Sequence, residues 1–278
     1  MTASLAVIFA GILHAIWNAI AKGGADRWAS FALIGVGQSL VILPLVPFVA
    51  PPAPAAWPWL IASLLVHLAY LGLLLKSYGL GDFSQVYPLA RGSAPLLVTL
   101  VAAVALGERP SWTQLAGVLA VCGGLAVLAL AGAREVDDRA VAAALLTGVS
   151  IAAYTILDGI GVRDAGGAAS YIVWLFALEA PLTVVLIYAI RGRASLLERL
   201  DRRQCALGLG GGLIAMAAYG IVLWAQTRGT MASVAALRET GVISGAIIGA
   251  VFFAERMGVR RVAAACVVAA GVVLITAH

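Results

Sequence analysis

The sequence predicts an all-α integral membrane protein, with ten transmembrane helices arranged as two inverted five-helix repeats around a central cavity. Three observations support this fold class: the composition, ten apolar segments, and polar residues that recur at matching places in the two halves. Of the 278 residues, 63% are hydrophobic and 11% are charged, whereas soluble domains carry about 25% charged residues. Because lipid cannot hydrogen-bond free backbone groups, the apolar segments must cross the membrane as helices.

The apolar segments have the length of about 20 residues that a helix needs to cross a bilayer. They cover residues 4–22, 29–49, 56–75, 83–106, 112–131, 139–158, 168–190, 204–227, 231–253 and 259–277. The first segment has no basic residues before it and no clear cleavage site, so we expect it to be kept as a membrane span. The longest charged connection, 191–204, is predicted to be a short interfacial helix with its basic side chains among lipid headgroups.

The two halves of the chain share polar residues at nearly constant offsets. An offset of 147 residues aligns Arg91 with Arg238, Glu108 with Glu255 and Arg109 with Arg256, and an offset of 137 aligns Gly11 with Gly148. We therefore predict one repeat over 1–137 and a second over 138–278. Each repeat has five spans, an odd number, so the two copies must cross the membrane in opposite directions. Inverted repeats of this kind are typical of secondary transporters, whose substrate site lies near the midplane.

The basic residues of the connections predict the orientation. Connections after odd-numbered segments hold thirteen Lys and Arg residues, and those after even-numbered segments hold three. Positive charge collects on the cytoplasmic side, so we expect a multi-pass protein of the bacterial inner membrane with both termini in the periplasm. These connections also account for the net charge of +5, and no nucleic-acid partner is predicted.

Four charged residues fall well inside the predicted spans: Arg91, Glu179, Arg238 and Glu239. A charge at the bilayer centre costs about 2.5–3.5 kcal/mol on insertion scales, and such residues face the bundle interior or a cavity. Two interpretations stay open: a buried network of ion pairs, or a substrate pathway. Adjacent helical positions point about 100° apart, so we expect Arg238 and Glu239 not simply to neutralise each other.

The stretch VYPLARGSAPLL (86–97) favours the substrate pathway. Tyr87, Pro88, Arg91 and Pro95 fall on one broad helix face, because residues three and four apart lie on the same side. Both prolines leave a carbonyl without its helical donor, which membranes tolerate only against protein or water. We predict that this face looks into a wet interior and that Pro88 and Pro95 act as hinges. Glycines 241, 245 and 249 are interpreted as a ridge for tight helix packing.

Further cavity candidates are polar or aromatic residues within spans: His14, Trp17, Asn18, His67 and Trp174. The first three lie on one helix face, and the tryptophans can stack on an organic substrate. The alternative is that the histidines are hydrogen-bonded packing residues and the tryptophans belong to interfacial belts. Glu108 and Glu255 precede the next helix, so we interpret them as carboxylates at that helix N-terminus.

No catalytic constellation is recognisable, and neither the histidines nor the three cysteines are spaced as a metal site. The GLGGG of 208–212 lacks the preceding strand and the Lys-Ser/Thr ending of a phosphate loop. We therefore expect no catalytic residue, no metal, no cofactor and no enzymatic activity.

Three stretches carry a resemblance to a known family: LGERP (106–110), its counterpart FAERM (253–257), and AGILHAIWNAIAK (10–22) in the first span. The chain resembles the drug/metabolite transporter superfamily and, within it, the ten-helix EamA-type branch, over essentially its whole length. The resemblance implies ten helices in two inverted repeats, alternating access and export of amino acids, other metabolites or drugs. The first span has no glutamate of the kind that four-helix relatives use for proton exchange.

The leading hypothesis is a secondary transporter, acting as a monomer, that exports aromatic or other neutral amino acids or related small metabolites across the inner membrane. Arg91 and Arg238 would bind the carboxylate, Glu179 or Glu239 the amine, and Trp17, Tyr87 and Trp174 the apolar side chain. The main alternative is an exporter of cationic or lipophilic drugs in which Glu179 dominates. A membrane scaffold or an intramembrane enzyme is a further alternative.

Overall fold

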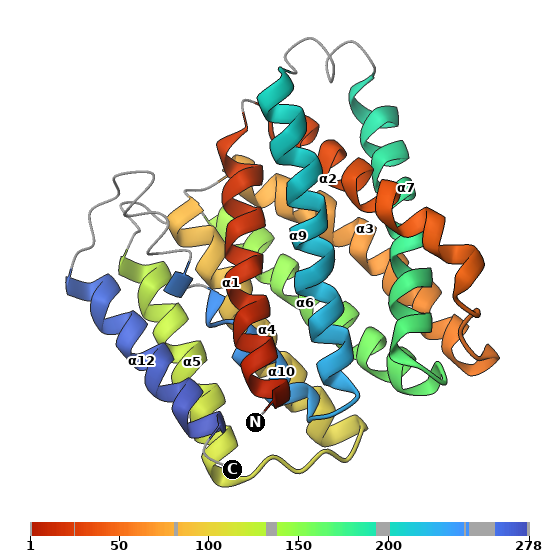
Figure 1. The fold of residues 1–278 in the computed structure, drawn as a ribbon. Coiled ribbons are helices and arrows are strands. Elements are labelled where there is room, and N and C mark those ends of the chain that lie inside the picture. Colours follow the sequence, from red (N-terminus) through yellow and green to blue (C-terminus); the bar gives the residue numbers. More distant parts are fainter. Residues whose placement is uncertain are drawn as a thin grey trace.

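A computed structural model of the chain describes residues 2–24, 26–80, 83–131, 138–192, 201–241, 243–244 and 259–276. These residues form ten α-helices, two short 3-10 helices and no strand (Figure 1). The elements are α1 (Thr2–Gly23), α2 (Arg27–Ile42), η1 (Leu43–Phe48), η2 (Pro54–Ala56), α3 (Trp57–Leu80), α4 (Phe83–Ala105), α5 (Trp112–Ala131), α6 (Asp138–Asp164), α7 (Ala168–Arg191), α9 (Arg202–Gln226), α10 (Met231–Arg238) and α12 (Val259–Thr276).

Local sequence signals explain where several helices begin. Asp26 accepts the backbone N–H groups of Trp28 and Ala29 at the start of α2. Asp201 and Gln204 form a reciprocal capping box at the start of α9, which satisfies donors that a helix leaves free in its first turn. Pro44 lies near the start of η1 and Pro47 lies within it. A proline has no backbone N–H to donate, so the α-helical hydrogen bonds of α2 do not continue through this segment.

Six segments are long and apolar enough to cross a membrane: α1, α2 with η1, η2 with α3, α6, α7 and α9. Three shorter apolar helices cover Leu89–Ala105, Trp112–Val127 and Ala263–Thr276. The helices follow the predicted segments closely, and the protein is an all-helical multi-pass membrane protein. The ten-span inverted arrangement stays a prediction, and the interfacial helix expected at 191–204 falls largely outside the described residues.

The ninth predicted span differs from the expectation of one continuous helix over 231–253. Helix α10 ends at Arg238, and the next two residues form tight turns in which the N–H of Glu239 donates to the Ala236 carbonyl and that of Thr240 to the Leu237 carbonyl. This break is buried against α1, since a Cβ atom on Gly11 would lie 2.9 Å from the Gly241 nitrogen. Irregular backbone at membrane depth is tolerated when protein covers it.

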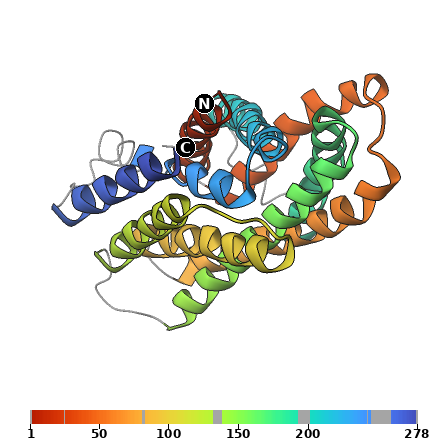
Figure 2. The same cartoon turned by 90° about the horizontal axis from the view of Figure 1, so that it is seen from below.

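Eight helices form a closed ring through pairwise contacts. In order around the ring they are α1, α10, α4, α6, α3, α7, α2 and α9, and α9 returns to α1. Helices α5 and α12 pack side by side outside the ring, next to α4 and α10 (Figure 2). The contacts come in matched sets: α1 with α9 parallels α6 with α3, and α1 with α10 parallels α6 with α4.

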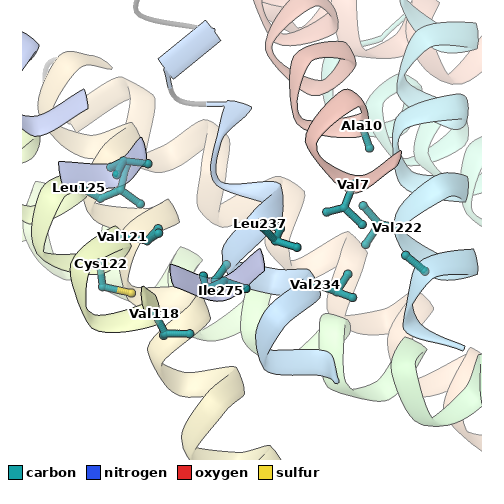
Figure 3. Close-up of a cluster of buried hydrophobic side chains, with 13 residues drawn as sticks. Val7, Ala10, Val118, Val121, Cys122, Leu125, Val222, Val234, Leu237 and Ile275 are labelled. Atoms are coloured by element: carbon teal, nitrogen blue, oxygen red, sulfur yellow. The ribbon is translucent and has the colours of Figure 1, made fainter. Parts of the chain in front are cut away.

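A cluster of buried apolar side chains joins the outer helix pair to the ring. Val118, Val121 and Leu125 of α5 lie with Leu237 of α10 and Ile275 of α12 (Figure 3). The same cluster continues through Val234 to residues of α1 and α9. This packing fixes α10, which ends in the two charged residues considered next.

Candidate functional site

A group of buried charged side chains lies where α1, α4 and α10 meet. The Nε atom of Arg91 donates to Oε2 of Glu239 at 2.8 Å. Arg91, Arg238 and Glu239 are 2%, 3% and 0% exposed, so the pair is almost entirely removed from solvent. We call Arg91, Arg238, Glu239 and His14 the cationic cluster, because its two guanidinium groups face one carboxylate. The sequence left open whether Arg91 pairs with Glu179, and the structure pairs it with Glu239 instead.

Arg238 and Glu239 were expected not simply to neutralise each other, and their contact is an ion pair without a hydrogen bond. Their Nε and Oε1 atoms are 3.6 Å apart, within ion-pair range. The 100° rule does not apply, because the helix ends between the two residues and the backbone turns. At this distance no hydrogen bond forms, and both atoms are buried without a hydrogen-bond partner among the described residues. The cationic cluster therefore contains a buried N–H group of Arg238 that lacks an acceptor.

His14 connects this cluster to the first helix. Its Nε2 atom lies 2.8 Å from Nη1 of Arg91, and its Nδ1 atom accepts the indole N–H of Trp17 at 3.1 Å. Asn18 donates to the backbone carbonyl of His14, so His14, Trp17 and Asn18 lie on one face of α1. A neutral imidazole accepts only one hydrogen bond, while arginine and tryptophan only donate. His14 can thus serve one of these two neighbours at a time.

Aromatic rings fill the region beside the cationic cluster. His67 of α3 stacks on Tyr154 of α6 with centroids 4.0 Å apart. Tyr219 of α9 lies edge-on to both rings, and Tyr70 lies edge-on to Tyr154. These four residues form the aromatic group. His67 was a predicted cavity residue, whereas Tyr70, Tyr154 and Tyr219 were not among the predicted site residues.

A second buried charge, Asp158 of α6, was missed by the sequence reasoning. Asp158 is 0% exposed, and its two oxygens accept the hydroxyl groups of Tyr171 at 2.9 Å and of Tyr219. The sixth apolar segment was predicted to end at residue 158, and Asp158 was not among the charged residues placed within a span. Helix α6 continues to Asp164, which places Asp158 inside the bundle.

Glu179 of α7 lies on the side of Asp158 rather than beside the arginines. Its carboxylate interacts electrostatically with His67 and Asp158. Its Oε2 atom is buried and has no hydrogen-bond partner among the described residues. We call Asp158, Glu179, Tyr171 and Tyr219 the acidic pocket. Tyr154 and Tyr219 interact electrostatically with Arg238 as well as Asp158, so they lie between the cationic cluster and the acidic pocket.

Other predicted site residues lie elsewhere or outside the described side chains. The Trp174 indole donates to the Val49 carbonyl and stacks edge-on against Trp57, away from the contacts of the cationic cluster. The side chains of Tyr87 and Pro88 lie outside the described part of the chain. Helix α4 is continuous through both predicted hinge prolines, Pro88 and Pro95. The structure therefore places its backbone break in α10.

Glu108 makes a contact different from the predicted one. Instead of facing the start of the next helix, its carboxylate accepts the N–H of Met231, the first residue of α10, at 3.0 and 3.2 Å. Arg163 donates to Glu108 and to the carbonyls of Gln226 and Gly229. We call these contacts the α10 tie. The start of α5 is capped by Ser111 and Gln114, which removes the need for Glu108 there.

A cavity of about 870 Å³ lies at the other end of the bundle, away from the termini (Figure 1). It is lined by the last turns of α1, including Ile16 and Ile20, and the first turns of α9, including Gln204 and Gly208. The α10 tie therefore closes the bundle at one end, and a cavity opens between α1 and α9 at the other.

Comparison with known proteins places this architecture in a family. Residues 138–277 match the EamA-like transporter family. The chain belongs to the EamA-like transporter family. A solved structure described only as a crystal structure of a protein is similar, with a TM-score of 0.77 and 19% identity over 99% of this chain and 98% of that chain. This likeness establishes the fold alone. The search of curated proteins found no match.

Membership of the EamA-like family makes the chain a membrane transporter of small molecules. The matched residues coincide with the second predicted repeat. The buried polar side chains described above come from seven of the eight ring helices, all but α2. In the described part of the chain, no group of three or more His, Cys, Asp or Glu residues can hold a metal ion. The candidate site described above is made of charged and aromatic side chains.

Proposed function

We propose that this EamA-like transporter exports aromatic or other neutral amino acids across the bacterial inner membrane by alternating access. The observation that carries the proposal is a pair of buried, oppositely charged sites with aromatic rings between them. A neutral amino acid carries one carboxylate and one ammonium group, so it complements both sites at once. Carboxylates pair well with guanidinium groups, which present several fixed donors.

The carboxylate is assigned to the cationic cluster. Two arginines and one glutamate leave an excess of one positive charge when His14 is neutral. The unpartnered Nε–H of Arg238 suits an incoming carboxylate. Leaving a buried donor unpaired costs about 1–3 kcal/mol, so an anionic group entering here gains more than it would at the protein surface. We assign the ammonium group to Glu179, because Glu239 already pairs with Arg91.

The aromatic group suits the side chain of the substrate. His67, Tyr154 and Tyr219 present ring faces and edges within 6 Å of one another. Aromatic pairs prefer offset or edge-on geometry with centroids about 4.5–7 Å apart, and Tyr219 has this spacing to both His67 and Tyr154. A phenylalanine or tyrosine side chain fits such surroundings.

The difference between the two ends of the bundle supports export by alternating access. The α10 tie closes the end that loop charge predicts to be periplasmic, and the cavity of about 870 Å³ opens at the end predicted to be cytoplasmic. The two inverted repeats, 1–137 and 138–278, would rock about α4 and α10. The matched contacts of α1 with α10 and of α6 with α4 support this symmetry. We propose that a monomer suffices, because the ring is closed within one chain.

Proteoliposomes loaded with labelled phenylalanine test the proposal, with and without a pH gradient. We expect phenylalanine to cross faster than in protein-free liposomes, and unlabelled tyrosine and leucine to compete with it. Replacing Arg238 with Gln should slow phenylalanine strongly and leave phenethylamine, which has no carboxylate, nearly unchanged. Rates equal to those of protein-free liposomes for every amino acid would refute the proposal.

A second candidate function is the export of cationic drugs. The acidic pocket and the aromatic group favour it, because cations bind both carboxylates and aromatic faces. In that case Glu179→Gln should abolish drug resistance in cells, while Arg91→Gln and Arg238→Gln variants that still fold should keep it.

A further inference from the structure

The acidic pocket contains the fully buried carboxylate of Asp158 and the carboxylate of Glu179, a half-buried residue whose Oε2 atom is buried. Asp158 receives only tyrosine hydroxyls, and the Oε2 atom of Glu179 has no hydrogen-bond partner. Among the described residues, no ion pair involves Asp158 or Glu179. Burying an ionised carboxylate without a counter-charge is strongly unfavourable. The carboxylates must therefore be neutralised, either by a proton or by a cation that enters the pocket.

Nearby side chains cannot supply that charge by themselves. His67 is the basic residue that interacts with Glu179, but its Nδ1 atom lies 3.0 Å from the Ser63 carbonyl and 3.2 Å from its hydroxyl. Arg238 interacts with Tyr154 and Tyr219, and its nearest carboxylate is Glu239. The tyrosines that reach Asp158 are neutral donors. Hence the missing group comes from outside the protein.

The polar atoms around the pocket also fit a donor with several hydrogens. Asp158 keeps free lone pairs, since a carboxylate accepts about four hydrogen bonds, and Glu179 offers the unpartnered Oε2. Thr155 lies one turn before Asp158 on α6, and Gln226 of α9 donates to the Thr155 carbonyl. Oγ1 of Thr155 and Oε1 of Gln226 are buried and lack partners among the described residues. Unsatisfied buried atoms of this kind indicate a ligand or water. A primary ammonium group has three N–H donors.

We propose that Asp158, positioned by Tyr171 and Tyr219, together with Glu179 forms the site that binds the ammonium group of the transported solute. This inference rests on the proposed function and sharpens it, because it makes a protonated amine a requirement for transport. It also adds Asp158 as a specificity-determining residue. Analogues that carry a hydroxyl in place of the amine cannot fill the pocket, because they leave both carboxylates without a counter-charge.

Three labelled compounds with one ring system separate the two ends of the substrate. Phenylalanine carries both charges, phenyllactate lacks the ammonium group, and phenethylamine lacks the carboxylate. We expect the wild-type protein in proteoliposomes to prefer phenylalanine over phenyllactate by at least about tenfold, the effect of losing a charge-assisted hydrogen bond. Asp158→Asn and Glu179→Gln should each bring this ratio close to one by slowing phenylalanine, with phenyllactate unchanged. Asp164→Asn, an exposed aspartate on the same helix, should keep the wild-type ratio.

If the wild-type protein transports none of the three compounds, the proposed function is refuted, but the binding site is not yet tested. A binding measurement then tests the site by itself. Phenethylamine should raise the Tm of the purified wild-type protein and of Asp164→Asn, but not of Asp158→Asn or Glu179→Gln. Tyr171→Phe keeps the carboxylate and should retain part of the shift, which guards against a misfolded Asp158 variant.

Three outcomes would overturn the proposal. One is an unchanged preference for phenylalanine in both acid variants. Another is an unchanged ratio of phenylalanine to phenyllactate transport in the acid variants, together with loss of the phenylalanine accumulation that a pH gradient drives. The pocket would then bind a proton rather than the ammonium group. The third, decisive even without transport, is an equal Tm shift by phenethylamine in the wild-type and both acid variants.

Discussion

Removing the carboxylate of Glu108 tests how the α10 tie holds the protein together. Glu108 accepts the Met231 N–H at the N-terminus of α10 through both of its oxygens. A hydrogen bond to a charged group contributes about 1.5–3 kcal/mol, and a negative charge at a helix N-terminus about 0.3–1 kcal/mol. Glutamine keeps an acceptor but not the charge, so Glu108→Gln should lose about 1–2 kcal/mol.

Arg163 gives an independent measure of the same tie. Its guanidinium donates at 2.9 Å to the carbonyls of Gln226 and Gly229, and these bonds vanish in Arg163→Gln. The ion pair with Glu108 adds less than about 1 kcal/mol, because the arginine side chain is 35% exposed. Half of each residue's hydrogen bonds go to backbone groups, and the exposed ion pair that the two share adds little. The loss in the double variant should therefore fall short of the sum by less than about 1 kcal/mol.

Thermal unfolding of the purified protein measures both effects. At about 2–4 °C per kcal/mol for a chain of this size, each single variant should lower the Tm by several degrees and the double variant by close to the sum. Asp164→Asn and Arg109→Gln remove one charge each from exposed neighbours and should leave the Tm unchanged. The reasoning fails if the double variant is no less stable than either single variant, or if the control variants lose as much.

Three further predictions concern the buried contacts. Gly212→Ala places a Cβ atom 2.9 Å from the Gln38 backbone nitrogen, so it should lower the Tm by an amount equivalent to about 1–3 kcal/mol. Gly210→Ala is the control, because its Cβ atom would point into open space, and it should leave the Tm unchanged. Arg91→Gln leaves buried Glu239 with Arg238, whose Nε atom is 3.6 Å away and not hydrogen-bonded to it, and should destabilise the protein by up to about 3–5 kcal/mol. Glu239→Gln in the same chain should restore part of the loss; expression level and Tm report this, and full stability of Arg91→Gln would contradict it. Trp174→Phe removes one hydrogen bond to Val49, which predicts a loss of about 1 kcal/mol and an unchanged KM for phenylalanine; a changed KM would place Trp174 in the substrate pathway.

Residues 2–24, 83–105 and 202–226 show what the sequence alone can give. Each segment was predicted as a span, and each forms a helix with nearly the predicted bounds. The reason is local: hydrophobic length and capping residues decide where a membrane helix begins and ends. The same local information marked Arg91, Arg238 and Glu239 as buried charges, since nothing else explains a charge within an apolar segment.

The tertiary structure decided which of these groups meet. Arg91 pairs with Glu239 rather than Glu179, because α4 crosses α10 and not α7 at that depth. Asp158 looked like the end of a span, since the two tyrosines that shield its charge come from other helices. Glu108 caps α10 instead of the helix that follows it. Composition and periodicity thus determined a multi-helix membrane protein and its candidate charges, whereas the partner of each charge depended on helix crossings between residues far apart in the chain, which no local pattern encodes.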